Sequence, residues 1–239
     1  MDDSYDDQSV GARWPAYMEE LRSGNRRDQL LLGIPALDDQ LHLPRERKQL
    51  VVIALPWEPA GETPFVIAQA FAKQGAAPLC IYPSWSPYWD GSLDVRRLEE
   101  EAVSPVPYDR FRTAAGPHQP ILIDQFSRLY WDVSRSHASR EEVVELAGRD
   151  MHSLSQQVSA PVVVFVRRRT RDVVQMSGND LRSDGALEYE ADAVVMIDPH
   201  PATSTADMLV VKHQNGPTGL FAGVPWPVLP RTVYRRNST

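Results

Sequence analysis

Residues 51–72 read VVIALPWEPAGETPFVIAQAFA: an apolar run, a loop containing proline and glycine, and a helix-forming segment. The run at 51–55 is continuously apolar, as expected of a strand buried on both faces of a parallel sheet. A strand, a loop and a helix in this order are where a parallel α/β domain binds phosphate, because the loop amides and the helix N-terminus point at the anion. The segment therefore predicts both a fold class and a place to look for a site.

Apolar β-branched runs alternate with helical segments along the rest of the chain. We predict strands at 50–55, 79–82, 121–123, 162–166, 193–197 and 209–211, and helices at 63–74, 93–102 and 140–158. This alternation indicates an α/β fold in which helices flank a mostly parallel central sheet. At 239 residues, the chain has the length of one such domain with a short appendage.

The first 28 residues form the expected appendage. The start is polar and acidic, which predicts a tail that does not pack. Trp14, Tyr17, Met18 and Leu21 then follow helical spacing and predict a short amphipathic helix that ends near Gly24. We accordingly divide the chain into a tail with this helix, 1–28, and a main domain, 29–239.

Composition excludes several classes of protein. The formal net charge of -7 argues against a protein that coats nucleic acid by bulk charge, so any DNA contact must be local. The single cysteine, Cys80, lies in the apolar run LCIY and is predicted to be a buried strand residue. The six histidines show no ligand spacing, so no metal site is expected from them.

No targeting or membrane segment is expected either. No apolar run approaches the roughly 20 residues that span a bilayer, and the acidic start MDDSYDDQ is the reverse of a secretory signal. These observations predict a cytoplasmic protein.

The loop after the first strand departs from a working phosphate loop. Such a loop ends in Gly-Lys-Ser/Thr, where the lysine reaches the phosphates and the hydroxyl binds magnesium. This one ends Gly61-Glu62-Thr63 and is two residues longer than usual. A carboxylate in place of the ammonium turns an attraction into a repulsion of about 4 kcal/mol at about 4 Å. We expect weak or absent binding of ATP and Mg²⁺; taken alone, the loop is better explained as a plain strand-to-helix turn.

Two later stretches carry a family resemblance. DLRSDGALEYEADAVVMI, from Asp180, and VKHQNGPTG, from Val211, resemble two signature stretches of the DnaB-type replicative helicases. The resemblance extends backward in order through APVVVFV, ILIDQF and the phosphate loop, and covers roughly residues 14–236. It implies a RecA-like P-loop ATPase core preceded by a linker helix. The separate N-terminal domain of the family is not expected here.

Matching the family motifs position by position implies that catalysis is lost. The phosphate-contacting lysine of the family falls on Glu62, the glutamate that polarises the attacking water on Ser84, and the arginine finger on Gln214. The polar sensor falls on Arg167 or Arg168. We therefore expect that the chain is not an enzyme, although it resembles an ATP-dependent DNA helicase.

Other positions of the same site are retained. The resemblance assigns them as remnants of the nucleotide and magnesium site: Gly61, Thr63, Asp124 and Lys212. Among these, Asp124 ends a predicted strand, where the family places a carboxylate that holds magnesium.

A run of arginines is the best candidate for a DNA contact. Four arginines within five positions form a local anion-binding patch on an otherwise acidic protein. The alternative is a solvated loop or internal salt bridges. Together with two positions that the resemblance retains from the DNA-binding loops, the candidates are Arg167, Arg168, Arg169, Arg171, Arg182 and Gly185.

Three readings of function follow. In the first, a catalytically degenerate DnaB-like domain acts in replication, recombination or repair by binding single-stranded DNA, further copies of itself, or helicase and replication proteins. In the second, a divergent but active ATP-dependent helicase uses a compensating cation such as Lys73 or Arg167. In the third, a regulator inserts into a DnaB-type ring and inhibits it.

Overall fold

The structure is a computed structural model. It describes residues 29–43, 48–56, 63–83, 96–100, 112–124, 126, 140–168, 186–200 and 202–226. The predicted tail and helix at 1–28 lie outside the described residues, so the division of the chain at residue 28 stays a prediction.

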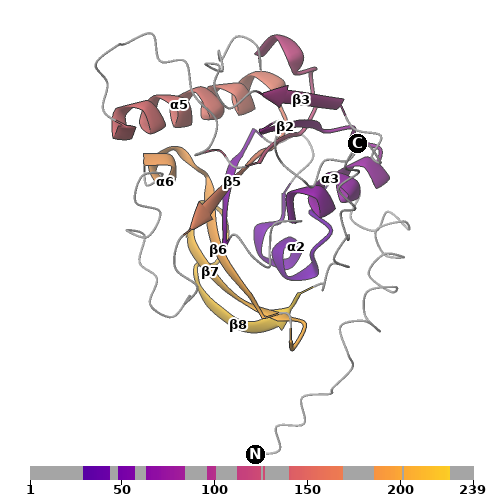
Figure 1. The fold of residues 1–239 in the computed structure, drawn as a ribbon, viewed down its shortest axis with the longest axis vertical. Helices are drawn as coiled ribbons and strands as arrows, with labels where there is room; N and C mark the ends of the chain where they lie inside the picture. Colours follow the sequence, from indigo (N-terminus) through magenta and orange to yellow (C-terminus); the bar gives the residue numbers. More distant parts are fainter. Residues whose placement is uncertain are drawn as a thin grey trace, which may run out of the picture.

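An eight-stranded sheet forms the centre of the domain (Figure 1). Its strands run in the order β3-β2-β4-β5-β1-β6-β7-β8, and neighbours from β3 to β6 are parallel while β7 and β8 are antiparallel. The bounds are β1 Leu50–Pro56, β2 Leu79–Pro83, β3 Arg96–Glu100, β4 Ile121–Ile123, β5 Val162–Arg168, β6 Ala193–His200, β7 Thr205–His213 and β8 Gly219–Pro225. The prediction of an α/β fold with a mostly parallel central sheet is confirmed.

Helices cover both faces of this sheet. Helices α2 (Pro35–Leu41) and α3 (Thr63–Lys73) pack on one face, whereas α5 (Arg140–Val158) and α6 (Ala186–Glu190) pack on the other (Figure 1). Strand β1 serves both cores, since Val51, Ile53 and Leu55 face α2 and α3 while alternate residues face α5. None of the described helices is long and apolar enough to cross a membrane.

One predicted helix is wrong. Residues 93–102 were expected to be helical, but Arg96–Glu100 forms strand β3, which pairs in parallel with β2 from Leu79 to Pro83. The sequence RRLEE lacks the apolar alternation of a half-buried strand. An edge strand tolerates such charge, and backbone pairing with β2 outweighs the local helix propensity.

On its antiparallel side, the sheet contains more strand residues than the sequence predicted. The strand expected at 209–211 runs from Thr205 to His213, and β8 was not predicted at all. Strand β8 has only partly buried or exposed residues and contains Gly219 and Gly223, so its sequence carries little strand signal. Cys80, in contrast, is buried in β2 as predicted.

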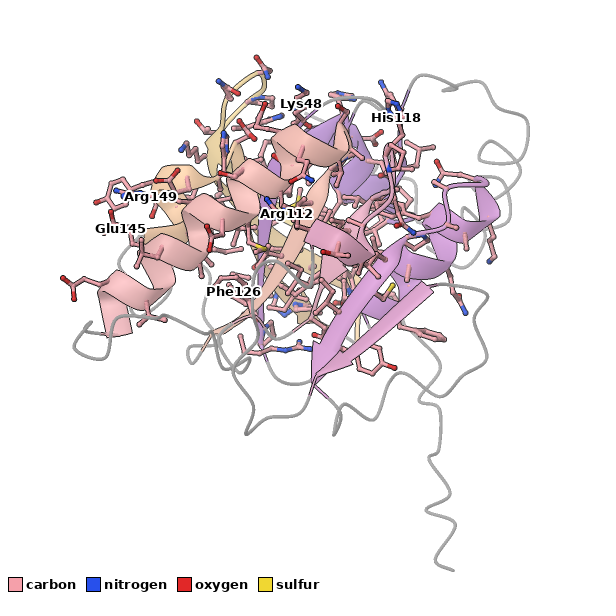
Figure 2. All side chains as sticks on the ribbon, turned by 90° about the horizontal axis from the view of Figure 1, so that it is seen from above. Lys48, Arg112, His118, Phe126, Glu145 and Arg149 are labelled. Atoms are coloured by element: carbon pink, nitrogen blue, oxygen red, sulfur yellow. The ribbon has the colours of Figure 1, made fainter. Side chains whose placement is uncertain are left out.

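Because strands β1 to β6 are parallel, their amino ends lie on one side of the sheet and their carboxyl ends on the other. We call these two lines of strand ends the amino edge and the carboxyl edge. Lys48 and His118 precede β1 and β4, and both lie toward one side of the molecule in Figure 2, whereas Phe126, which follows β4, lies toward the other. The carboxyl ends of β1, β4 and β5 therefore meet at the Phe126 side. In open α/β sheets this is the edge that holds functional groups.

Side-chain hydrogen bonds hold the segment before α2 in place. They come from Gln74, directly after α3, and from Asp38 of α2. The Gln74 amide accepts a hydrogen bond from the Leu31 N–H at 2.9 Å and donates one to the Leu31 carbonyl at 2.7 Å. The buried Asp38 carboxylate accepts the N–H groups of Leu32 and Gly33. Gly33 adopts φ +80°, and a Cβ added there would lie 2.5 Å from the Cβ of Ala70.

We predict that alanine at Gly33 would lower the stability of the domain for two reasons, which a control variant can separate. Gly33→Ala should lower the free energy of unfolding by about 2–4 kcal/mol, from the left-handed backbone and from overlap with α3. Gly75→Ala is the matched control, because Gly75 has φ +75° but nothing within 4 Å of an added Cβ; it should cost only about 1 kcal/mol. Urea unfolding followed by circular dichroism measures both, and equal losses would contradict the steric part of this account.

Candidate functional site

Asp124 stands at the carboxyl edge of the sheet, directly after β4. Its backbone N–H donates to the Ile81 carbonyl at 2.9 Å, which holds it against the end of β2. On its other side β4 pairs with β5, with Ile123 opposite Val164. The position predicted to carry the magnesium-binding carboxylate therefore lies between two strand ends.

Strand alternation brings Asp124 and Arg167 to the same face of the sheet. Leu122 and Phe165 both face the core under α2 and α3, and Asp124 and Arg167 each follow one of them by two positions. Arg167 lies opposite Leu55 near the end of β1. The two charged residues thus project from neighbouring strands toward the side on which α3 begins.

The two side chains form a buried ion pair. Arg167 Nη2 lies 3.3 Å from Asp124 Oδ1, with the side chains 2% and 1% exposed. Arg167 Nη1 donates to the Pro56 carbonyl at 3.4 Å. One guanidinium therefore connects the ends of β1, β4 and β5.

The burial of Arg167 corrects its predicted role. The residue as a whole is partly exposed, but its side chain is inside, where it meets a carboxylate and cannot contribute to a surface patch for DNA. Of the two positions that the sensor could occupy, Arg167 has a described side chain, and it reaches Asp124. The other arginines and the glycine of the predicted DNA surface lie outside the described side chains: Arg168, Arg169, Arg171, Arg182 and Gly185.

Thr63 supplies a hydroxyl at the start of α3. Its side chain is fully buried, and its Oγ1 has no hydrogen-bond partner among the residues that the structure describes. An unsatisfied buried hydroxyl is costly, so such a group is expected to serve a ligand or an adjacent loop. The neighbouring predicted positions Gly61, Glu62 and Ser84 lie outside the described residues.

Lys212 and Gln214 lie at the opposite edge of the sheet. Strand β7 is antiparallel to β6, and Lys212 pairs with Val194 near the amino end of β6. The Lys212 ammonium donates to the carbonyls of Glu188 and Tyr189 at 2.9 and 3.0 Å, where a cation stabilises the C-terminus of α6. Lys212 therefore lies away from Asp124 within one chain, and its assignment to the nucleotide site stays a prediction.

Gln214 is an exposed residue of the turn between β7 and β8. Its N–H donates to the Asp192 carbonyl at 2.9 Å, which fixes the turn against the start of β6. A side chain presented at this edge faces away from the chain's own Asp124.

The compensating role suggested for Lys73 is excluded by its position. Lys73 ends α3, ten residues after Thr63. At 1.5 Å per residue, the helix places the two about 15 Å apart, on opposite ends of the same element. Arg167 is the cation that reaches the site.

His213 has a structural role that the sequence did not reveal. A Cβ added to Gly216 would collide with the His213 imidazole, so the glycine in NGPTG makes room for this ring. Burial and the nearby His42 lower the pKa of His213. The neutral ring is thus the form that packs in the β7–β8 turn.

No family model matches the chain. The replicative DNA helicase DnaB of Leifsonia xyli subsp. xyli (strain CTCB07) is 29% identical over 111 residues, which cover 41% of this chain and 23% of that protein. The replicative DNA helicase DnaB of Mycobacterium leprae (strain TN) is 28% identical over 111 residues, covering 41% of this chain and 18% of that protein.

Solved structures give the same answer for the fold. A solved ATPase domain superposes with a TM-score of 0.58 at 14% identity, covering 90% of this chain and 94% of that one. A DnaB-like replicative helicase, described with its interactions with primase, gives a TM-score of 0.62 at 15% identity, covering 86% and 63%. The RadB recombinase gives 0.58 at 10% identity, covering 80% and 92%.

The chain has a RecA-like fold, and a stretch of 111 residues is similar in sequence to DnaB replicative helicases. The matched stretch covers less than a quarter of each curated relative, so their activities and partners are not transferred to this chain by the match alone. What the chain shares with the solved structures is the RecA-like fold. Its Arg167–Asp124 pair is the feature of the site that the structure adds.

The buried pair is predicted to be strongly coupled. Asp124→Asn and Arg167→Gln should each lower the free energy of unfolding by about 3–5 kcal/mol, because each leaves a buried charge without its partner. The double variant should lose clearly less than the sum. The measurement is a double-mutant cycle by urea unfolding.

Glu145 and Arg149 on α5 provide the control cycle. They form an i,i+4 pair whose side chains are 46% and 58% exposed, and Figure 2 shows them side by side on the outside of the molecule. Their coupling should be no more than about 0.5 kcal/mol. A similarly small coupling for Arg167 and Asp124 would mean that the buried pair contributes nothing specific.

Proposed function

We propose that this DnaB-type domain serves DNA replication, recombination or repair by binding rather than by hydrolysing ATP. Its ligands would be single-stranded DNA or helicase and replication proteins. The observation that carries the proposal is the buried contact between Arg167 and Asp124. It concerns Asp124, the strand-end carboxylate that the family resemblance assigns to magnesium.

Phosphoryl transfer in P-loop enzymes depends on a metal that bridges the phosphates and is held by the loop hydroxyl and by a strand-end carboxylate. Thr63 fits that requirement, since its buried hydroxyl has no partner among the described residues. Asp124 does not fit it, because an oxygen of its carboxylate already faces a guanidinium at 3.3 Å. Among the described residues, the pairing of Asp124 with Arg167 supports a site that does not bind magnesium.

The replaced positions in the sequence support the same conclusion. Glu62 stands where the phosphate-contacting lysine is expected, Ser84 where the water-polarising glutamate is expected, and Gln214 where the arginine finger is expected. Loss of an arginine finger alone costs about 10³ to 10⁵ in rate in related hydrolases. Such losses do not multiply within one catalytic unit, but any one of them suffices to suppress turnover.

The binding role rests on charge and on the retained scaffold. With Arg167 inside, the arginines left for a phosphate backbone are Arg168, Arg169, Arg171 and Arg182. Backbone phosphates of single-stranded DNA are suitable ligands for such a run. One solved relative of the fold is described with its interactions with primase, which makes replication proteins the natural protein partners to test.

The function is tested by combining a hydrolysis assay with DNA binding. We expect no ATP hydrolysis above background with or without single-stranded DNA, and DNA binding that weakens as salt rises. Substituting Arg168, Arg169 and Arg171 together by alanine should reduce the slope of log affinity against log salt by about 2, at about 0.7 per phosphate contact.

Arg149→Ala is the control for that variant, because Arg149 is an exposed arginine of α5 that is not part of the arginine run in the sequence. Its removal should leave the salt slope unchanged. DNA-stimulated hydrolysis by the wild-type domain would refute the non-hydrolytic role, and an unchanged slope in the triple variant would refute the DNA-binding surface.

A further inference from the structure

The guanidinium of Arg167 lies where a cation would be needed. Asp124 is 1% exposed, and a buried carboxylate requires a positive partner because the cost of removing its charge from water is several kcal/mol. In the magnesium sites of P-loop domains the metal itself provides that charge. Here Arg167 provides it, from β5, the strand next to β4.

The guanidinium is also held in this position by the backbone. Nη1 donates to the Pro56 carbonyl at the end of β1, while Nη2 faces Asp124. Its side chain is 2% exposed, so solvent does not compete for these contacts. Two acceptors fix the planar guanidinium, one at the end of β1 and one directly after β4. The Arg167 side chain is therefore a structural part of the site and not a surface side chain.

We propose that Arg167 is an internal substitute for the divalent cation, and that without its guanidinium the Asp124 carboxylate would bind such a cation, with the Thr63 hydroxyl on the same side of the sheet as a second ligand. The wild-type domain then discriminates against Mg²⁺ and Mn²⁺ by occupying their carboxylate with a covalently attached cation. Removing the guanidinium exposes two oxygen ligands of the kind that these hard cations prefer, the Asp124 carboxylate and the buried Thr63 hydroxyl.

This inference rests on the proposed function for the assignment of Asp124 as the magnesium-carboxylate position, but it makes a separate statement about metal selectivity. Hydrolysis of ATP without any divalent cation would refute the non-hydrolytic role and leave the substitution by Arg167 intact. Binding of a divalent cation at Asp124 in the wild-type domain would refute the substitution and leave the absence of hydrolysis intact.

The test uses Mn²⁺ alone as the probe, in the absence of nucleotide. Binding is followed by the electron paramagnetic resonance signal of free Mn²⁺ and by thermal unfolding. The wild-type domain and Asp124→Asn should deplete the free-ion signal equally little. Arg167→Gln should bind one additional Mn²⁺ and gain about 3 °C in Tm at a Mn²⁺ concentration of about ten times its Kd.

Two further variants separate cation substitution from a merely structural contact. Arg167→Lys keeps a positive charge beside Asp124 and should bind no additional Mn²⁺. Arg167→Gln combined with Asp124→Asn should lose the gain of the single variant. If Arg167→Gln is unfolded in metal-free buffer, millimolar Mn²⁺ should restore its circular dichroism spectrum.

The proposal is overturned by any of three results. These are Asp124-dependent Mn²⁺ binding by the wild-type domain, an Arg167→Gln variant that folds but binds no additional Mn²⁺, and an Arg167→Gln variant that stays unfolded when Mn²⁺ is added. The last two would mean that Arg167 stabilises the strand ends without standing in for a metal.

Discussion

The ion pair between Arg167 and Asp124 is the contact on which the carboxyl edge of this sheet depends. A guanidinium from β5 faces the carboxylate after β4 and donates to the last carbonyl of β1, so three strand ends converge on one charge. Because both side chains are buried, each requires the other: an unpaired charge at this depth would cost more than the pair contributes. Under the proposed function, this pair stabilises the strand ends of the RecA-like scaffold in place of a bound metal.

Much of the sheet was predictable because buried parallel strands leave a strong signal. The runs VVIAL and VVVFV are apolar at every position, as two-sided burial requires, and both are central strands. The two outer strands were less predictable, because they lack this burial on both faces. Strand β3 has charged residues and β8 has glycines and exposed positions, so each owes its existence to pairing with a neighbour rather than to its own pattern.

The sequence could indicate candidate site residues but not the contacts that they make. A strand-end carboxylate and a hydroxyl at the start of a helix identified Asp124 and Thr63. No sequence pattern could indicate that Arg167 faces inward rather than joining the arginines that follow, since that depends on the register of β5 against β1 and β4. The placement of Lys212 at the opposite edge follows from the antiparallel β6–β7 hairpin, which the sequence analysis had not anticipated at its full length.

The most direct test of this account is a crystal structure of the wild-type domain grown with millimolar MgCl₂ and a non-hydrolysable ATP analogue. The account predicts that the Arg167 guanidinium still contacts Asp124 and that no magnesium is coordinated by that carboxylate. A magnesium ion bound to Asp124 and Thr63, with Arg167 displaced from the strand ends, would contradict it.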